Sequence, residues 1–245
     1  MSVQTVERTA ASRLRTILGT GTHPVVEPSL RAELFLIAHE DETGRPHIDP
    51  AKLELALAVA ILLELWLDNL ILIGWRFSAR HGTYQADPGL ITICDTTATG
   101  DPLKDAALVM LWHTNAPRVR DFIRDFAATG LYERVRGDMI ATGLLRRTTR
   151  RRFFRRTDSY TAVHENHPVR ARTKVRNLAT SEPGSHPGHD GPYPYTVALA
   201  ALVTRVGLAR YLASENVTWL QQRLAAIAQS IPTIREVITA FGRSR

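Results

Sequence analysis

The densest group of chemically capable side chains lies in residues 144–157, which read LLRRTTRRRFFRRT. The stretch contains seven arginines: Arg146, Arg147, Arg150, Arg151, Arg152, Arg155 and Arg156. Neighbouring guanidinium groups repel one another, but each can donate two parallel hydrogen bonds to a phosphate or a carboxylate. Two large apolar rings, Phe153 and Phe154, stand among them. This composition indicates a binding surface for an anion that also offers apolar contact.

An anionic membrane is the partner that fits both features. Each arginine near an anionic leaflet contributes about 1 kcal/mol of attraction. Aromatic rings at the end of a basic hairpin can enter the headgroup region and add apolar burial. We therefore predict a peripheral membrane protein that binds anionic phospholipid through the seven arginines, with Phe153 and Phe154 inserting.

Three other interpretations of the same stretch stay open. Nucleic acid would accept the arginines through its phosphates and the rings through base stacking, although no helix-turn-helix pattern accompanies them. An acidic face of another copy, or of a partner protein, would accept the same charges, giving a homo-oligomer or an interaction adaptor. The plainest interpretation is a solvated basic loop.

The rest of the chain does not favour an enzyme. It contains no GxSxG nucleophile motif, no Walker phosphate loop and no GxGxxG that follows a strand. Two histidine pairs, His164 with His167 and His186 with His189, have the spacing of metal ligands. Both pairs lie in segments that we interpret as solvated loops, so we expect no metal and no cofactor.

Glu64 and Cys94 are isolated side chains that need an interpretation. Glu64 lies inside an apolar helix, where we predict pairing with an arginine or with backbone donors rather than catalysis as a base. Cys94 sits in the apolar run LITIC, and we predict a core position for it. Because it is the only cysteine, an intrachain disulfide is excluded and a cytoplasmic setting is favoured.

The basic charge is localised. The chain of 245 residues carries a net charge of +7, whereas residues 144–177 alone carry +9, with eleven basic residues against two acids. The remainder therefore carries −2, the difference between +7 and +9. A near-neutral body with one basic element favours a localised anionic partner.

The arginine stretch must be positioned by a mainly α-helical body. Residues 53–73 are apolar on nearly every side, but Glu54, Glu64 and Asp68 interrupt them. An acid near the middle of a membrane span costs roughly 2.5–3.5 kcal/mol, which argues against a transmembrane segment. We predict instead the central helix of a bundle, capped by Asp49.

We predict a loose tail over 1–28 and one helical domain over 29–245, with two buried helices, surrounding amphipathic helices and short β-hairpins. The central helix is expected from Pro50 to about Asn69, and a second buried helix at 196–212. Further helices are expected at 30–41, 101–114, 117–128, 131–142, 167–180, 215–229 and 232–242. Strands are expected at 70–77 and 89–95 with 80–88 as their connection, a basic hairpin at 144–161 after a cap at Gly143, and a loop at 181–195.

Four segments, in this order, resemble the Golgi phosphoprotein 3 family: LRAELFLIAHEDETGRP, LALAVAILLELWLDNLI, TGDPLKDAAL and LYERVRGDMIATGLL. The resemblance covers roughly residues 30–240. It implies a mostly helical domain with a hairpin linked to membrane contact and oligomer formation, which falls on 144–161 here. Eukaryotic members are peripheral Golgi proteins that bind phosphatidylinositol 4-phosphate, and related proteins occur in actinobacteria. The resemblance therefore implies a non-enzymatic, cytoplasmic protein at the inner face of a membrane.

The positions that hold the headgroup in eukaryotic members differ in this chain. A tryptophan and an arginine of the family fall on Asp49 and Ala58, and two basic positions fall near Thr129 and Tyr132. Arg134 and Arg136 lie close by and join the seven arginines as candidate lipid-binding residues. These differences favour phosphatidylglycerol, cardiolipin or plain phosphatidylinositol over phosphatidylinositol 4-phosphate.

Overall fold

The computed structural model describes residues 28–80, 82–152, 155–181, 193–212 and 216–243. For residues 150–152, 155–157 and 193 it describes the backbone alone. The tail predicted over 1–28, apart from its last residue, and most of the loop predicted over 181–195 lie outside these residues.

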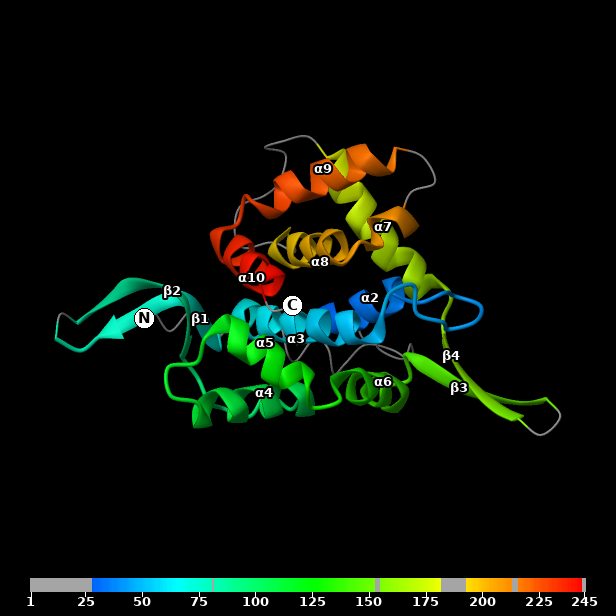
Figure 1. Ribbon diagram of the computed structural model, residues 1–245, viewed down its shortest axis with the longest axis horizontal. Coiled ribbons are helices and arrows are strands. Elements are labelled where there is room, and N and C mark those ends of the chain that lie inside the picture. Colours follow the sequence, from blue (N-terminus) through cyan, green and yellow to red (C-terminus); the bar gives the residue numbers. More distant parts are fainter. Residues whose placement is uncertain (1–27, 81, 153–154, 182–192, 213–215, 244–245) are drawn as a thin grey trace, which may run out of the picture.

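Helix α3 (Pro50–Leu67) runs through the middle of the molecule, as the sequence predicts (Figure 1). It begins where the carboxylate of Asp49 accepts a hydrogen bond from the Ala51 amide at 2.9 Å, with Pro50 in the first turn. This cap satisfies one of the amide groups that a helix start leaves unpaired. Since the helix is apolar on all sides, it is buried between helices on two faces.

The remaining helices form layers on either side of α3 (Figure 1). Helix α8 (Tyr193–Val206) is a second largely buried helix and packs on α3; it begins and ends earlier than the helix predicted at 196–212. Its side of the molecule also holds α7 (Asn166–Thr180), α9 (Val217–Ala228), α10 (Pro232–Gly242) and the 3₁₀ turn Leu208–Tyr211. The opposite side holds α4 (Pro102–His113), α5 (Val119–Ala127) and α6 (Leu131–Ala141), while α2 (Leu30–Ile37) lies against α3. The mainly α-helical class is confirmed.

A buried ion pair joins α2 to α3. The amide of Arg31 donates to Glu64 Oε1 at 2.9 Å, and its guanidinium contacts the other carboxylate oxygen. The same guanidinium lies 2.5 Å from Asp101 Oδ2 and 3.3 Å from Asp138 Oδ2, so it also reaches α4 and α6. Burial raises the pKa of Glu64, and Arg31 opposes that shift. The predicted pairing of Glu64 with an arginine is confirmed.

Two antiparallel hairpins leave the helical body at opposite ends of its long axis (Figure 1). One pairs β1 (Ile71–Ser78) with β2 (Thr83–Ile93), and the other pairs β3 (Leu145–Arg152) with β4 (Arg155–Ala162). The second lies where the sequence predicts a hairpin, at 144–161.

Several sequence predictions need correction. The connection predicted at 80–88 is partly strand, because β2 begins at Thr83, where it pairs with Ser78. Helix α2 ends at Ile37 rather than near residue 41, and α5 begins two residues after Pro117, whose carbonyl accepts from the Ile91 amide at 2.9 Å.

Cys94 and His167 also differ from their predicted environments. Cys94 is exposed rather than part of the core, because β2 ends at Ile93 and the chain leaves the buried strand there. His167 is buried and lies in the first turn of α7, so it is not a solvated loop histidine. Burial lowers its pKa.

Candidate functional site

The basic hairpin is joined rigidly to the end of α6. Gly143 has φ +75°, a left-handed conformation that favours glycine, and it ends the helix as predicted. The next amide, of Leu144, donates to the Met139 carbonyl at 2.8 Å. The Leu144 carbonyl accepts from Val163 at 3.0 Å, which closes the base of the hairpin. Since Leu144 and Leu145 are buried, the first strand of the hairpin begins within the core.

The register of the hairpin places arginine opposite arginine at its outer end. The pairs run from Leu145 with Ala162 to Arg151 with Arg156 and Arg152 with Arg155. Like charges directly opposite one another in an antiparallel pair are destabilising. An acid is absent from the sequence between residues 146 and 157. We call residues 150–152 and 155–157 the outer hairpin.

In the inner part of the hairpin, positive charge is partly balanced by the one acid of the hairpin, Asp158. Arg147 Nη2 lies 2.5 Å from Asp158 Oδ2, and the Thr149 hydroxyl donates to Oδ1 at 2.6 Å. The hydrogen bond with Asp158 raises the pKa of Arg147. Arg146 is exposed. We call residues 145–149 and 158–162 the hairpin root; of its two arginines, Arg147 is held by an internal partner.

Arg136 connects α6 to the hairpin root, whereas Arg134 does not. The Arg136 guanidinium lies over the ring of Tyr160 at 4.0 Å and forms an ion pair with Glu133. Arg134 donates to the Thr129 hydroxyl at 3.0 Å, away from the hairpin. The difference follows from their spacing, because residues two apart on a helix do not share a face.

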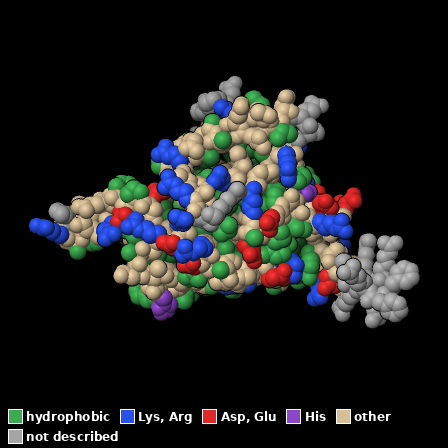
Figure 2. Space-filling view, viewed as in Figure 1, with side chains coloured by type: hydrophobic (Ala, Val, Ile, Leu, Met, Phe, Trp, Pro, Cys, Tyr) green, Lys and Arg blue, Asp and Glu red, His purple; other side chains and the backbone are tan. Residues whose placement is uncertain are grey.

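A pocket of about 480 Å³ lies between the hairpin root, α6 and the loop after α2. Its lining is Glu42, Thr43, Gly44, Arg45, Pro46, Tyr132, Arg136, Asp158, Ser159 and Tyr160. The loop approaches β4 so closely that a Cβ on Gly44 would lie 2.0 Å from the Tyr160 carbonyl oxygen. Acidic and basic side chains intermingle in this part of the surface (Figure 2). The pocket therefore offers two arginines to an anion, beside two carboxylates.

His39 holds Tyr132, one of the side chains that line this pocket. Its Nδ1 lies 2.7 Å from the Phe35 carbonyl, which can only accept, so Nδ1 carries the proton. Its Nε2 then accepts from the Tyr132 hydroxyl at 2.8 Å. Burial lowers the pKa of His39 to about 4, so the imidazole is neutral at pH 7. Sequence reasoning missed His39, since its partner is 93 residues away and no local pattern relates them.

The family positions that hold a headgroup in eukaryotic relatives have other roles here. Asp49 caps α3, and Ala58 is completely buried. Thr129 accepts from Arg134, and Tyr132 donates to His39. None of these four side chains carries a positive charge. Phe153 and Phe154 lie outside the described residues, as do the side chains of the outer hairpin.

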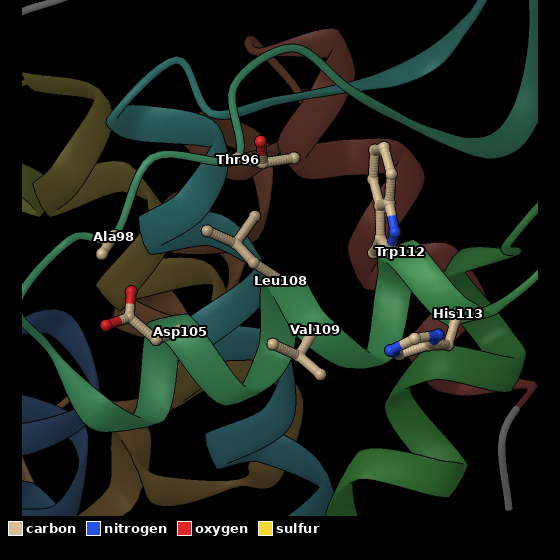
Figure 3. A pocket seen from close by; sticks show the side chains of 7 residues that line it. All are labelled: Thr96, Ala98, Asp105, Leu108, Val109, Trp112 and His113. Atoms are coloured by element: carbon tan, nitrogen blue, oxygen red, sulfur yellow. The ribbon is translucent and has the colours of Figure 1, made fainter.

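A second pocket, of about 380 Å³, lies along α4 (Figure 3). It is lined by Thr96, Ala98, Asp105, Leu108, Val109, Trp112 and His113. Trp112 and His113 stand at one end and Asp105 at the other (Figure 3). The Asp105 carboxylate accepts from the Thr99 amide and hydroxyl, both at 2.7 Å, which lowers its pKa. This largely apolar hollow has no arginine or lysine in its lining, so it is a poor site for a phosphate.

Two further properties bear on function. Across the described ranges, no group of three or more His, Cys, Asp or Glu side chains is arranged to hold a metal ion. Within the same part of the chain, none of the helices combines the length and apolar character that crossing a bilayer requires. The His186 and His189 pair lies outside the described residues.

A mainly helical body with a basic hairpin directly after helix α6 defines the class of protein to which this chain can be compared. The family model described as Golgi phosphoprotein 3 (GPP34) matches residues 30–241. The chain belongs to the Golgi phosphoprotein 3 family, as its four sequence segments suggested. A search of curated proteins found no matching sequence.

Proposed function

We propose that this protein binds anionic phospholipid at a membrane surface through its outer hairpin, without catalysing a reaction. The observation that carries the proposal is the register, which sets Arg151 opposite Arg156 and Arg152 opposite Arg155. A free hairpin bears the cost of this repulsion. Phosphate groups bound between the two strands would neutralise the opposed arginines and remove the repulsion. Anion binding and hairpin stability therefore support each other.

The expected strength of the interaction is sufficient for reversible binding. The outer hairpin contributes five arginines, and each basic residue near an anionic leaflet is worth about 1 kcal/mol. Attraction of this kind is screened by salt over roughly 10 Å at 0.1 M. Binding should therefore weaken steeply as the salt concentration rises.

The remaining candidate residues support the outer hairpin in this proposal. Arg146 adds a charge, while Arg147 and Arg136 hold the root through Asp158 and Tyr160. Arg136 and Arg45 also face the pocket beside the root, which would admit one headgroup. Phe153 and Phe154 would then enter the headgroup region. Arg134, which donates to Thr129, would add its charge from the body beside the hairpin.

The headgroup we favour is phosphatidylglycerol, cardiolipin or phosphatidylinositol. Selective binding of phosphatidylinositol 4-phosphate would need a dense cluster of cations around one phosphate. The pocket beside the root instead has two carboxylates, Glu42 and Asp158, in its lining beside its two arginines. A peripheral position on the cytoplasmic face of a membrane follows from this mode of binding.

Co-sedimentation with vesicles tests the proposal. The variant changes Arg150, Arg151 and Arg152 to Glu. This change turns the two like-charge pairs, at Arg151 and Arg152, into opposite-charge pairs, and Arg150 stands opposite Thr157, so the hairpin should fold at least as well as before. The matched control changes Arg120, Arg176 and Arg235 to Glu; these arginines are exposed on three other helices and give the same change in net charge.

Wild type and control should sediment with phosphatidylglycerol vesicles and stay in solution with phosphatidylcholine, whereas the hairpin variant should lose most of its binding. Equal sedimentation of all three proteins would contradict the proposal. A mobility shift of duplex DNA that the hairpin variant alone loses would favour nucleic acid instead. A molar mass by light scattering that changes in the hairpin variant alone would favour self-association.

A further inference from the structure

The hairpin at the other end of the molecule is divided into a buried base and a projecting arm. The β1–β2 register shifts between Ile73 and Trp75, where residues 87–90 of β2 stand against Gly74 alone in β1. Below the shift, Ile73 and Ile91 are buried in the core. Beyond it, residues 75–78 pair with 83–86 and extend past the helices (Figure 1). We call these two segments the aromatic arm.

One face of the aromatic arm carries three exposed rings. Trp75 pairs with Ala86, and Phe77 pairs with Tyr84. Residues directly opposite in an antiparallel pair point to the same face, and so do residues two apart on one strand. The exposed fractions are 46% for Trp75, 52% for Phe77 and 49% for Tyr84. This apolar face is therefore left to solvent in the isolated protein.

The charge of the aromatic arm is positive. Residues 75–86 include Arg76 and Arg80 but no acid. Asp87, next along the strand, accepts from Arg76 at 2.8 Å and from Arg118 at 2.7 Å, and these hydrogen bonds lower its pKa. Asp87 is thus engaged by both arginines, and Arg118, the residue before α5, ties the arm to the body. Basic side chains lie at the outer end of this arm (Figure 2).

We propose that the aromatic arm is a second bilayer-contacting element, which places Trp75, Phe77 and Tyr84 in the headgroup region of an anionic membrane. Tryptophan and tyrosine are favoured there because an apolar ring and a polar group meet the two sides of the interface. The positive charge of the arm complements an anionic leaflet and opposes docking on a basic partner. Because the arm projects from the body, its rings can enter a flat surface such as a bilayer, and they need no concave partner. The inference rests on the membrane binding proposed above.

Two contacts at opposite ends of the long axis would reinforce each other (Figure 1). A single weak anchor gives marginal, reversible attachment, and stable attachment usually needs two signals. Once the outer hairpin is bound, insertion of the aromatic arm becomes an intramolecular event at high effective concentration. The molecule would then lie with its long axis along the membrane.

A single-tryptophan protein tests the inference. Trp66, Trp112 and Trp219 are changed to Phe, which leaves Trp75 as the only tryptophan, and circular dichroism checks the fold. The probe is a phosphatidylglycerol vesicle with brominated acyl chains. Trp75 emission should shift to shorter wavelength and lose intensity, with no change on brominated phosphatidylcholine. Sedimentation of the same samples reports whether the protein is bound.

The outcomes separate the two proposals. Sedimentation without any change in Trp75 emission would overturn the role of the arm and leave the outer hairpin as the membrane contact. Absence of sedimentation would overturn both. Sedimentation together with quenching supports both.

A second variant tests the energetic contribution. Changing Trp75, Phe77 and Tyr84 to Ala in the wild-type background should weaken vesicle partitioning roughly ten- to hundredfold. Trp219 to Ala is the control, since this ring is also half exposed but lies on α9. Unchanged partitioning of the triple variant would overturn the inference, as would a triple variant that altered only the molar mass by light scattering, which would make the face a contact between copies.

Discussion

The guanidinium of Arg136 lies 4.0 Å from the centre of the Tyr160 ring, so that α6 and strand β4 are tied together at the hairpin root. Arg136 is also paired with Glu133 on its own helix, which orients the side chain. The basic hairpin is therefore attached to the helical body by a side-chain contact as well as by the chain itself. A hairpin whose two strands carry like charges needs such a support.

Changing Tyr160 to Leu should loosen the hairpin root. A cation–π contact at a partly exposed site is worth about 0.5–1 kcal/mol, and amide exchange of the root residues should speed up accordingly. Tyr160 to Phe keeps the ring and should leave exchange unchanged. Faster exchange in the Phe variant to the same degree would show that the hydroxyl, rather than the ring, holds the contact.

Removing Arg31 should destabilise the whole domain. Its loss leaves Glu64 buried without a cation, and breaking a buried pair from one side costs about 3–5 kcal/mol. Urea denaturation of Arg31→Met should show a lower midpoint with an unchanged slope. The double variant Arg31→Met with Glu64→Leu should recover part of the loss, whereas Arg124→Met on the surface should stay within about 0.5 kcal/mol of wild type. A double variant less stable than the single one would contradict this account.

Because of His39, the free energy of unfolding should decrease as the pH is lowered from about 6.5 to about 4. The folded state holds this histidine neutral with its pKa near 4, whereas in the unfolded chain it takes up a proton near pH 6.5. The unfolded state therefore binds more protons in this window, so the free energy of unfolding decreases as pH falls, by up to about 1.4 kcal/mol per pH unit. Neighbouring His47 and Arg136 add positive potential in the same direction.

The measurement is a series of urea titrations across that range, for wild type and for His39→Gln. The variant should be less stable at pH 7 but should show a shallower decline, since it has no proton to take up. Parallel curves for the two proteins would mean that other groups carry the pH dependence.

Changing Asp158 to Asn should tighten membrane binding. Asp158 is the one acid of the hairpin and neutralises Arg147, so its loss adds a net positive charge at the root. We expect about fivefold stronger partitioning onto phosphatidylglycerol vesicles. Asp121→Asn is the control with the same change in charge, since Asp121 is an exposed side chain on α5. Weaker partitioning of the Asp158 variant would indicate that the ordered root matters more than its charge.

Local signals in the sequence were sufficient for most of the helices. Asp49 before Pro50, and Asp101 before Pro102, mark the starts of α3 and α4, and both carboxylates cap as expected. Gly143 marks the end of α6. These features depend on neighbouring residues only, so one sequence is enough to find them.

Features that depend on distant pairing were not predictable. The start of β2 at Thr83 needs the partner strand, and the exposure of Cys94 depends on where that pairing stops. The contacts of His39 with Tyr132 and of Arg136 with Tyr160 join segments that only the fold brings together. The charge of the hairpin was evident from composition, but its division into a compensated root and a repelling outer part needed the register.

Hydrogen exchange of the backbone at residues 150–152 and 155–157, with and without vesicles, tests the central claim most directly. If the outer hairpin binds anionic lipid, its amides should exchange more slowly on phosphatidylglycerol vesicles and at the same rate on phosphatidylcholine. Protein that sediments with phosphatidylglycerol while these amides exchange as fast as in solution would contradict it.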